Sequence, residues 1–186
     1  RHVGSTERKL SGMHVRLDEV VHTAGDTRKL GIRVGDFIAF EPHYREMESG
    51  FIKSRFMDNK SGCFVLMEVA RQCRETNLDL PVELLFTNYE EVGHGGTSGF
   101  AETIEELLVV DMGVIGEYVA GDERKVSICA KDSTGPYDYE FRKRLTLLAE
   151  EQNIPFETAI YPFYGSDGSA AVRAGKDFRV ALIGPG

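Results

Sequence analysis

The chain has 186 residues, 41% of them hydrophobic and 28% charged, with a formal net charge of -8 and an isoelectric point near 5.2. This length suits one domain with a small appendage, and the composition is that of an ordinary soluble globular protein. The acidic balance argues against sequence-independent nucleic-acid binding, which needs a basic surface to displace counterions. Since no apolar run is long enough to cross a membrane and no signal peptide is visible, we expect neither a nucleic-acid nor a membrane partner.

The cysteines and the two chain ends add two expectations. Cys63, Cys73 and Cys129 are scattered and odd in number, which argues against a disulfide framework or a zinc–thiolate site and favours a reducing cytoplasm. The sequence opens at Arg1 and stops at Gly186 directly after a strand-like run, so we expect a protein truncated at both ends.

Residues 1–52 differ in pattern from the rest of the chain. The stretches 13–17 and 37–40 alternate between apolar and polar residues and are separated by turn signals, which predicts half-buried strands. A short helical piece is expected around 27–30. This part therefore reads as a portion of a small β domain.

From residue 53 onward, helices and strands alternate. Asn59 or Ser61 is expected to cap a first helix, whose apolar residues recur at helical spacing. Repeated strand–helix units predict an α/β fold with a mostly parallel sheet and helices on both faces, which binds ligands beyond the carboxyl ends of its strands. The expected strands are 82–87, 107–111, 118–120 paired with 126–130, 156–161 and 180–183, and the later helices are 98–106, 138–152 and 169–174.

Carboxylates fall at the functional ends of three of these elements. Glu90 and Glu91 follow the expected strand 82–87, Asp111 ends the next strand, and Asp58 begins the first helix. Converging carboxylates repel one another unless a cation neutralises them, and adjacent glutamates can divide metal binding from proton transfer. Each acid also has an ordinary explanation: Asp58 could cap a helix, Glu90 and Glu91 could lie in a solvated turn, and Asp111 could end a strand beside a turn. Only their occurrence together predicts a metal site.

Two further polar residues, Ser166 and Asp167, precede the short helix expected at 169–174. Free backbone N–H groups at a helix start can hold an anion, so this segment is a candidate for shaping the substrate pocket. A plain helix cap by either residue explains them at least as well.

Several short runs of the sequence, taken together, resemble the M42 family of metallo-aminopeptidases, which includes the glutamyl and deblocking enzymes that assemble into tetrahedral particles. The runs that carry this resemblance are 30–36, 57–62, 86–93, 109–113, 132–138 and 164–171. The resemblance implies a dinuclear zinc aminopeptidase-like sheet in an incomplete catalytic domain at 53–186. It also implies that 1–52 belong to an inserted β-barrel or PDZ-like domain.

The resemblance also implies a role for each acid. Asp58 would bridge two metal ions, Glu91 and Asp111 would each bind one of them, and Glu90 would be the general base. The peptide bond between Asp58 and Asn59 is a candidate for the cis form, which is costly without proline.

The family further requires two histidine ligands, which would lie upstream of Arg1 and downstream of Gly186. No histidine of this chain stands at either place, the five being His2, His14, His22, His43 and His94. His94 is the nearest substitute because it lies three residues after Glu91, although a loop histidine is more often a surface residue. With carboxylate ligands alone, we expect weak metal binding and little activity.

The function that follows is hydrolysis of N-terminal residues from peptides by a cytoplasmic enzyme with two divalent metal ions, zinc or cobalt. By resemblance alone, its partners are a peptide substrate and further copies of itself in a large homo-oligomer. Two alternatives stay open. One is a related dinuclear hydrolase that acts on acylated or specialised small peptides, and the other is a metal-poor, inactive fragment that serves in assembly.

Overall fold

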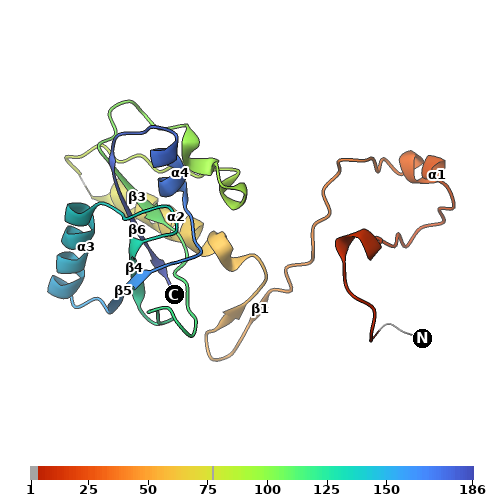
Figure 1. Cartoon of the computed structure of the whole chain (residues 1–186), viewed down its shortest axis with the longest axis horizontal. Helices are drawn as coiled ribbons and strands as arrows, with labels where there is room; N and C mark the ends of the chain where they lie inside the picture. The colour runs from red at the N-terminus through yellow and green to blue at the C-terminus, as the bar shows by residue number, and fades with distance from the viewer. Residues whose placement is uncertain (1–3, 77) are drawn as a thin grey trace. The chain divides into compact units, whose positions relative to one another are not determined.

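The computed structural model describes residues 4–76 and 78–186, and the chain divides into two compact units, Arg1–Glu41 and Pro42–Gly186 (Figure 1). The described part of the first unit contains a short 3₁₀ helix, η1 (Leu10–Gly12), and the helix α1 (Ala24–Lys29). A capping box between Thr23 and Asp26 begins α1.

The strands expected at 13–17 and 37–40 do not form in the first unit, so the β-barrel or PDZ-like part is not seen there. Val34 and Phe37 are fully exposed in it. An alternating stretch forms a stable strand only beside a partner strand and over a hydrophobic face, and these stretches have neither. The domain boundary expected after residue 52 stays a prediction.

The second unit opens with a small antiparallel hairpin, β1 (Arg45–Glu46) and β2 (Ile52–Lys53). The helix α2 (Met57–Glu75) follows, as the apolar spacing predicts. Asn59 Oδ1 accepts the N–H of Gly62 at 2.9 Å, so Asn59 caps the regular part of this helix as expected.

The core of the second unit is a four-stranded sheet with the order β3-β6-β4-β5. Its strands are β3 (Glu106–Val110), β4 (Val126–Lys131), β5 (Phe156–Ile160) and β6 (Arg179–Pro185). β3 runs parallel to β6 and β4 parallel to β5, whereas β4 and β6 are antiparallel. The expected mixed, mostly parallel α/β sheet is therefore confirmed.

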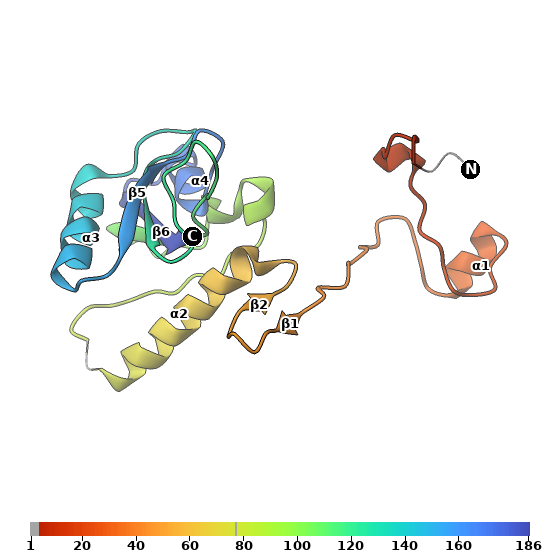
Figure 2. The same cartoon turned by 90° about the horizontal axis from the view of Figure 1, so that it is seen from below.

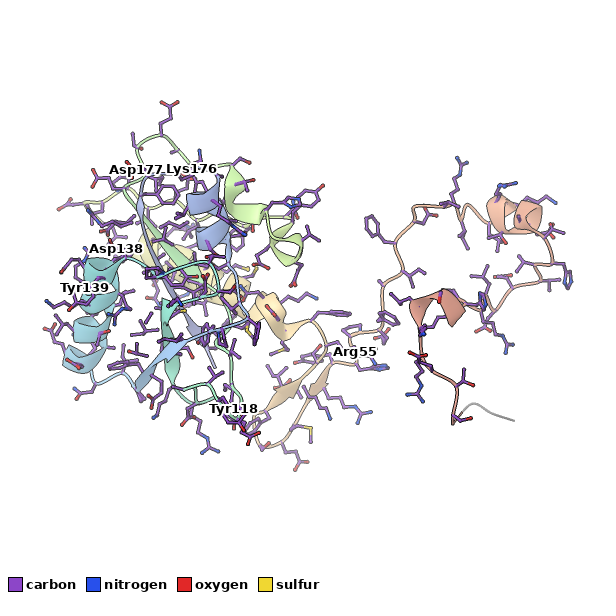
Figure 3. All side chains as sticks on the ribbon, viewed as in Figure 1. Arg55, Tyr118, Asp138, Tyr139, Lys176 and Asp177 are labelled. Atoms are coloured by element: carbon purple, nitrogen blue, oxygen red, sulfur yellow. The ribbon has the colours of Figure 1, made fainter. Side chains whose placement is uncertain are left out.

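Two further helices pack on this sheet, α3 (Tyr139–Glu151) and α4 (Asp167–Arg173). Asp138 caps α3 by accepting the N–H of Phe141, and Figure 3 labels it at the start of that helix. Figure 2 shows the sheet between α2 and α4. The hydrophobic core lies at the centre of the sheet and consists of Val109, Cys129, Tyr137, Ala159, Tyr161, Val180 and Leu182.

Three local predictions for the second unit are wrong. Residues 82–87 form no strand, because no described strand lies beside them to pair with. Residues 98–106 form no helix; the loop before them instead holds two short 3₁₀ helices, η2 (Glu90–Val92) and η3 (Gly95–Thr97). Val119 bridges Gly116 instead of pairing with β4, whose two edges are taken by β5 and β6.

None of the described helices combines the length and the apolar character that a membrane crossing requires.

Candidate active site

Five carboxylates line one pocket of about 410 Å³ in the second unit. Four of them, Asp58, Glu90, Glu91 and Asp111, are the acids that the sequence places at the ends of three elements. The fifth is Asp167, the first residue of α4. The expected convergence of these four acids thus occurs, although only Asp111 directly follows a strand of the sheet, and Asp167 joins them in the same pocket.

Asp58 lies in the first turn of α2 without capping it, because the helix begins one residue earlier, at Met57. Its backbone is not helical (φ -77°, ψ 116°), and the peptide bond between Asp58 and Asn59 is cis, as expected. Asn59 Nδ2 donates to the backbone O of Val110 at 2.9 Å. This bond joins the start of α2 to the end of β3 and brings Asp58 to the same rim as Asp111.

Glu90 and Glu91 open the short helix η2 directly after Tyr89, whose φ of 64° lies in the left-handed region. A bulky residue with a positive φ is uncommon and is found most often where function holds the backbone in place. The N–H of Gly93, at φ 82°, closes the turn onto the O of Glu90 at 2.8 Å. Glu90 is half-buried in the pocket and Glu91 is exposed.

Asp111 is 5% exposed and continues the β3 ladder, since its N–H donates to Ile183 O at 3.0 Å. Its Oδ1 accepts the N–H of Met112 at 2.7 Å, which fixes the side chain at the rim. Gly184 of β6 passes so close that a Cβ there would lie 1.4 Å from the O of Asp111. Only glycine fits at that position.

Asp167 joins three segments around the pocket. Its Oδ2 accepts a hydrogen bond from the hydroxyl of Thr87, three residues before Glu90. A Cβ on Gly95 would lie 2.5 Å from Asp167 Oδ1, and one on Gly96 would lie 2.0 Å from the Asp167 O. The glycines after Glu91 therefore let the loop close onto the start of α4.

Ser166 lies outside the residues that line this pocket. It is the N-cap of α4 in a capping box with Ser169, and its Oγ lies 2.8 Å from the hydroxyl of Tyr137. The helix-cap explanation therefore describes its contacts, and a role in substrate binding stays a prediction for both Ser166 and Asp167.

Burial and mutual repulsion raise the pKa of two acids of the pocket, Glu90 and Asp111. Burial, then the charges of Asp111, Asp167, Glu91 and Asp58, raises the pKa of Glu90 from 4.5 to about 7. The pKa of Asp111 is also raised, mainly by burial and further by Asp58 and Asp167, against the lowering effect of the Met112 N–H. A cation placed among these groups would relieve this repulsion.

The pocket offers the type of ligand that divalent cations prefer, but it does not offer a complete set of ligands. Carboxylate oxygens suit divalent cations. Yet across residues 4–76 and 78–186, no three His, Cys, Asp or Glu side chains form a ready-made metal-binding group. No described histidine lines the pocket, and His94 is exposed and stacks on Tyr89 with ring centroids 5.3 Å apart.

Sequence reasoning missed two residues that support the site. Thr87 lies at the end of an expected strand and within the run 86–93, but nothing in its spacing indicates its bond to Asp167. Tyr164 donates its hydroxyl to Met112 O at 3.1 Å, and burial with the Asp111 charge beside it raises the pKa of its phenol. Tyr164 belongs to one of the runs that carry the family resemblance, but no pattern in the sequence links it to Asp111.

Comparison with known proteins gives consistent matches. The sequence profile described as M42 glutamyl aminopeptidase matches residues 2–186. The putative aminopeptidase YhfE of Bacillus subtilis (strain 168) is 46% identical over 185 residues, which make up 98% of this chain and 54% of that protein. A putative aminopeptidase of Acetivibrio thermocellus is 29% identical over 77% of this chain and 46% of that protein.

Solved structures agree on the fold. Aminopeptidase APDkam598 from the archaeon Desulfurococcus kamchatkensis matches with a TM-score of 0.76 at 20% identity, over 89% of this chain and 49% of that one. TET1 peptidase of Pyrococcus horikoshii, which can assemble into a tetrahedron or a large octahedral shell, matches with a TM-score of 0.75 at 19% identity, over 98% and 58%. The chain thus spans about half the length of the relatives it matches.

Proposed function

Because this chain belongs to the M42 glutamyl aminopeptidase family, we propose that it carries the carboxylate half of the active site of a metal-dependent aminopeptidase. The reaction is removal of N-terminal residues from peptides. The observation that supports this most directly is that Asp58, Glu90, Glu91 and Asp111 line one pocket. A cation bound there would offset the electrostatic repulsion between these carboxylates.

In this proposal, Asp58, Glu91 and Asp111 would be the carboxylate ligands of two divalent ions, zinc or cobalt, with Asp58 contributing to both metal positions and Glu91 and Asp111 to one each. Such ions, when bound, polarise the scissile carbonyl and lower the pKa of a coordinated water. Glu90 is left free to accept a proton and to pass it to the leaving amine. A carboxylate is suited to that exchange when its pKa lies near neutral pH, as burial and its neighbours bring about for Glu90.

The test is Glu90→Gln in this chain, assayed on an aminoacyl-anilide with added zinc or cobalt. With the metal in excess, we expect the unaltered chain to show low but measurable turnover and Glu90→Gln to reduce it to background, while the bound metal, measured by elemental analysis, stays unchanged. Glu83→Gln is the matched control, since Glu83 is exposed and outside the pocket. Turnover retained by Glu90→Gln would show that Glu90 is not the general base. Loss of bound metal in this variant would show that Glu90 is a metal ligand instead.

The wider proposals for the whole protein follow the family. They are a peptide substrate, a cytoplasmic location and a large homo-oligomer, which the assemblies of Pyrococcus horikoshii TET1 peptidase support by analogy. A related hydrolase acting on acylated or specialised small peptides would use the same pocket. Size-exclusion chromatography with light scattering tests the oligomer, and a panel of free and N-acylated peptides tests the substrate.

A second candidate is a metal-poor fragment that serves in assembly. One observation favours it, namely the lack of a ready-made group of three metal-binding side chains in the described part of the chain. Under this alternative, calorimetric titration with zinc or cobalt gives no saturable binding. Under the first proposal, binding is measurable and depends on Asp58 and Asp111.

A further inference from the structure

One tyrosine, Tyr164, contacts the carboxylate site without lining its pocket. It belongs to the connection between β5 and α4, is partly buried, and packs against the core of the sheet. The residues that line the pocket include Asp167, three positions later, but not Tyr164 itself. Tyr164 therefore acts on the site through the residues that it contacts.

The hydroxyl of Tyr164 bonds to the segment that carries Asp111. It donates to Met112 O at 3.1 Å and so joins residues 52 positions apart in the chain. It also hydrogen-bonds the side chain of Asp111. Burial raises the pKa of this carboxyl, and hydrogen bonds from the Met112 N–H and the Tyr164 hydroxyl lower it. Because a phenol has one proton to donate, Met112 O and the Asp111 carboxylate share it.

The two donors to the Asp111 carboxylate restrain it in different ways. The N–H of Met112 donates to Asp111 Oδ1 at 2.7 Å, but this donor lies on the next residue of the chain and moves with it. Tyr164 comes from a separate segment. Its hydroxyl therefore ties the Asp111 side chain to the connection that leads into α4.

A side chain can position a neighbour only when its own place is fixed. The main chain of Tyr164 is held by Ser133, whose N–H donates to Tyr164 O at 3.2 Å and whose hydroxyl donates to the same oxygen. The ring of Tyr164 packs on that of Tyr161, with centroids 5.0 Å apart. Backbone, ring and hydroxyl of Tyr164 are thus each in contact with a different part of the second unit.

The turn that carries Ser133 is ordered by a buried acid that the proposed reaction does not use. Asp132 is 2% exposed, and its Oδ1 accepts the N–H of Thr134 at 2.7 Å and that of Gly135 at 3.2 Å. Its Oδ2 accepts the hydroxyl of Tyr137 at 3.0 Å. A buried carboxylate with these partners fixes residues 132–135, and through Ser133 it fixes Tyr164.

We propose that Tyr164 is a positioning residue, which holds the Asp111 carboxylate in the orientation in which it binds a metal ion. This inference rests on the proposed function, because it takes Asp111 as a ligand. Carboxylate ligands of metal sites are themselves hydrogen-bonded, and loss of such a partner typically weakens metal binding by a factor of about 10–100. Tyr164 acts through Asp111 and touches neither the metal nor the substrate.

A purely structural role predicts a different outcome. A partly buried phenol needs a hydrogen-bond partner in any protein, and Met112 O alone would satisfy it. In that case, removal of the hydroxyl would lower the stability of the fold and leave the metal site unchanged. The bond to Asp111 predicts a change at the metal site.

The test is Tyr164→Phe in the 186-residue chain, which removes one oxygen atom and keeps the ring. We expect binding of zinc and cobalt, measured by calorimetric titration, to weaken by roughly tenfold or more. We also expect the visible absorption spectrum of bound cobalt to shift at saturation, because that spectrum depends on the arrangement of the ligands. Circular dichroism and urea unfolding with a chelator show that the variant folds.

Tyr161→Phe is the matched control, since it removes the same hydroxyl from the neighbouring ring. Tyr161 is 1% exposed, its hydroxyl lies beside Ser127, and it is not among the groups that act on the pKa of Asp111. This variant should keep the metal affinity and the cobalt spectrum of the unaltered chain. Ser133→Ala removes one of the two bonds to Tyr164 O, so it should weaken metal binding in the same direction as Tyr164→Phe but by less.

A double substitution shows whether Tyr164 acts through Asp111. In the Asp111→Ala background, Tyr164→Phe should cause no further change in affinity or in the cobalt spectrum. The inference is overturned if Asp111→Ala weakens binding while Tyr164→Phe leaves both readouts unchanged, or if Tyr164→Phe acts equally in both backgrounds. If Tyr164→Phe does not fold, an unchanged affinity in Ser133→Ala overturns it instead. By contrast, an unaltered chain that binds no metal, or an Asp111→Ala variant that binds it normally, overturns the proposed function and this inference with it.

Discussion

The side chain of Asn59 holds the start of α2 against the end of β3 by donating to the backbone O of Val110 at 2.9 Å. Its other atom, Oδ1, accepts the N–H of Gly62 at 2.9 Å, so one amide caps the helix and ties it to the sheet. A Cβ on Gly62 would lie 2.7 Å from the same Val110 O. Close approach of helix and strand thus depends on both residues, and it positions Asp58 beside Asp111.

We therefore expect Asn59→Ala to destabilise the chain by about 1–3 kcal/mol, since it removes a helix cap and leaves the Val110 carbonyl without that donor. Urea unfolding followed by circular dichroism measures the change. Ser61→Ala is the control: its hydroxyl bonds only to the Met57 O within the same exposed turn, and its loss should cost clearly less. Equal effects of the two substitutions would contradict the special position of Asn59.

The sequence predicts those parts of the fold in which local pattern and final packing agree. α2, α3 and the strands β3, β5 and β6 follow apolar periodicity, and Asp58 and Asp111 follow from their places at the start of α2 and the end of β3. Glu90 and Glu91 line the same pocket although the strand expected before them does not form. The prediction of a strand at 82–87 is wrong because a strand needs a neighbouring strand to pair with. Apolar periodicity carries no information on whether that neighbour is present. The bond between Thr87 and Asp167 joins residues 80 positions apart, and no local pattern encodes such a contact.

Metal-free protein should lose stability as the pH rises. The pKa of Glu90 is about 7 in the folded chain against 4.5 for an ordinary glutamate, so the folded state holds this proton more tightly. The resulting stabilisation is complete below pH 4.5 and is lost as the pH rises through 7. The raised pKa of Asp111 acts in the same direction. Urea unfolding with a chelator at about pH 5 and about pH 8 measures the difference.

Glu90→Gln should flatten this dependence, because glutamine has no proton to lose and no charge to repel its neighbours. In the chelated state at about pH 8, we expect the variant to be more stable than the unaltered chain. Glu83→Gln, outside the pocket, should keep the original slope. An unchanged slope in Glu90→Gln would show that Glu90 titrates at its ordinary pKa.

Removal of a carboxylate ligand should lower the metal affinity, whereas removal of the general base should not. We expect Asp58→Asn and Asp111→Asn each to weaken binding of zinc or cobalt by roughly tenfold or more, while Glu90→Gln leaves it nearly unchanged. Isothermal titration calorimetry measures the affinities. Asp122→Asn, an acid that does not line the pocket, is the control. An unchanged affinity in both Asp58→Asn and Asp111→Asn would show that these two carboxylates do not hold the metal.

The three cysteines should react with iodoacetamide in a fixed order. Cys129 is 0% exposed in the core, and burial raises the pKa of its thiol to about 12, so few molecules carry the reactive thiolate at neutral pH. Cys63 is exposed and Cys73 is partly buried. Mass spectrometry over time should show Cys63 modified first and Cys129 last, at a rate set by global unfolding of the sheet. Because Cys129 lies at the centre of the core, its early modification in folded protein would contradict the packing of β4 between β5 and β6.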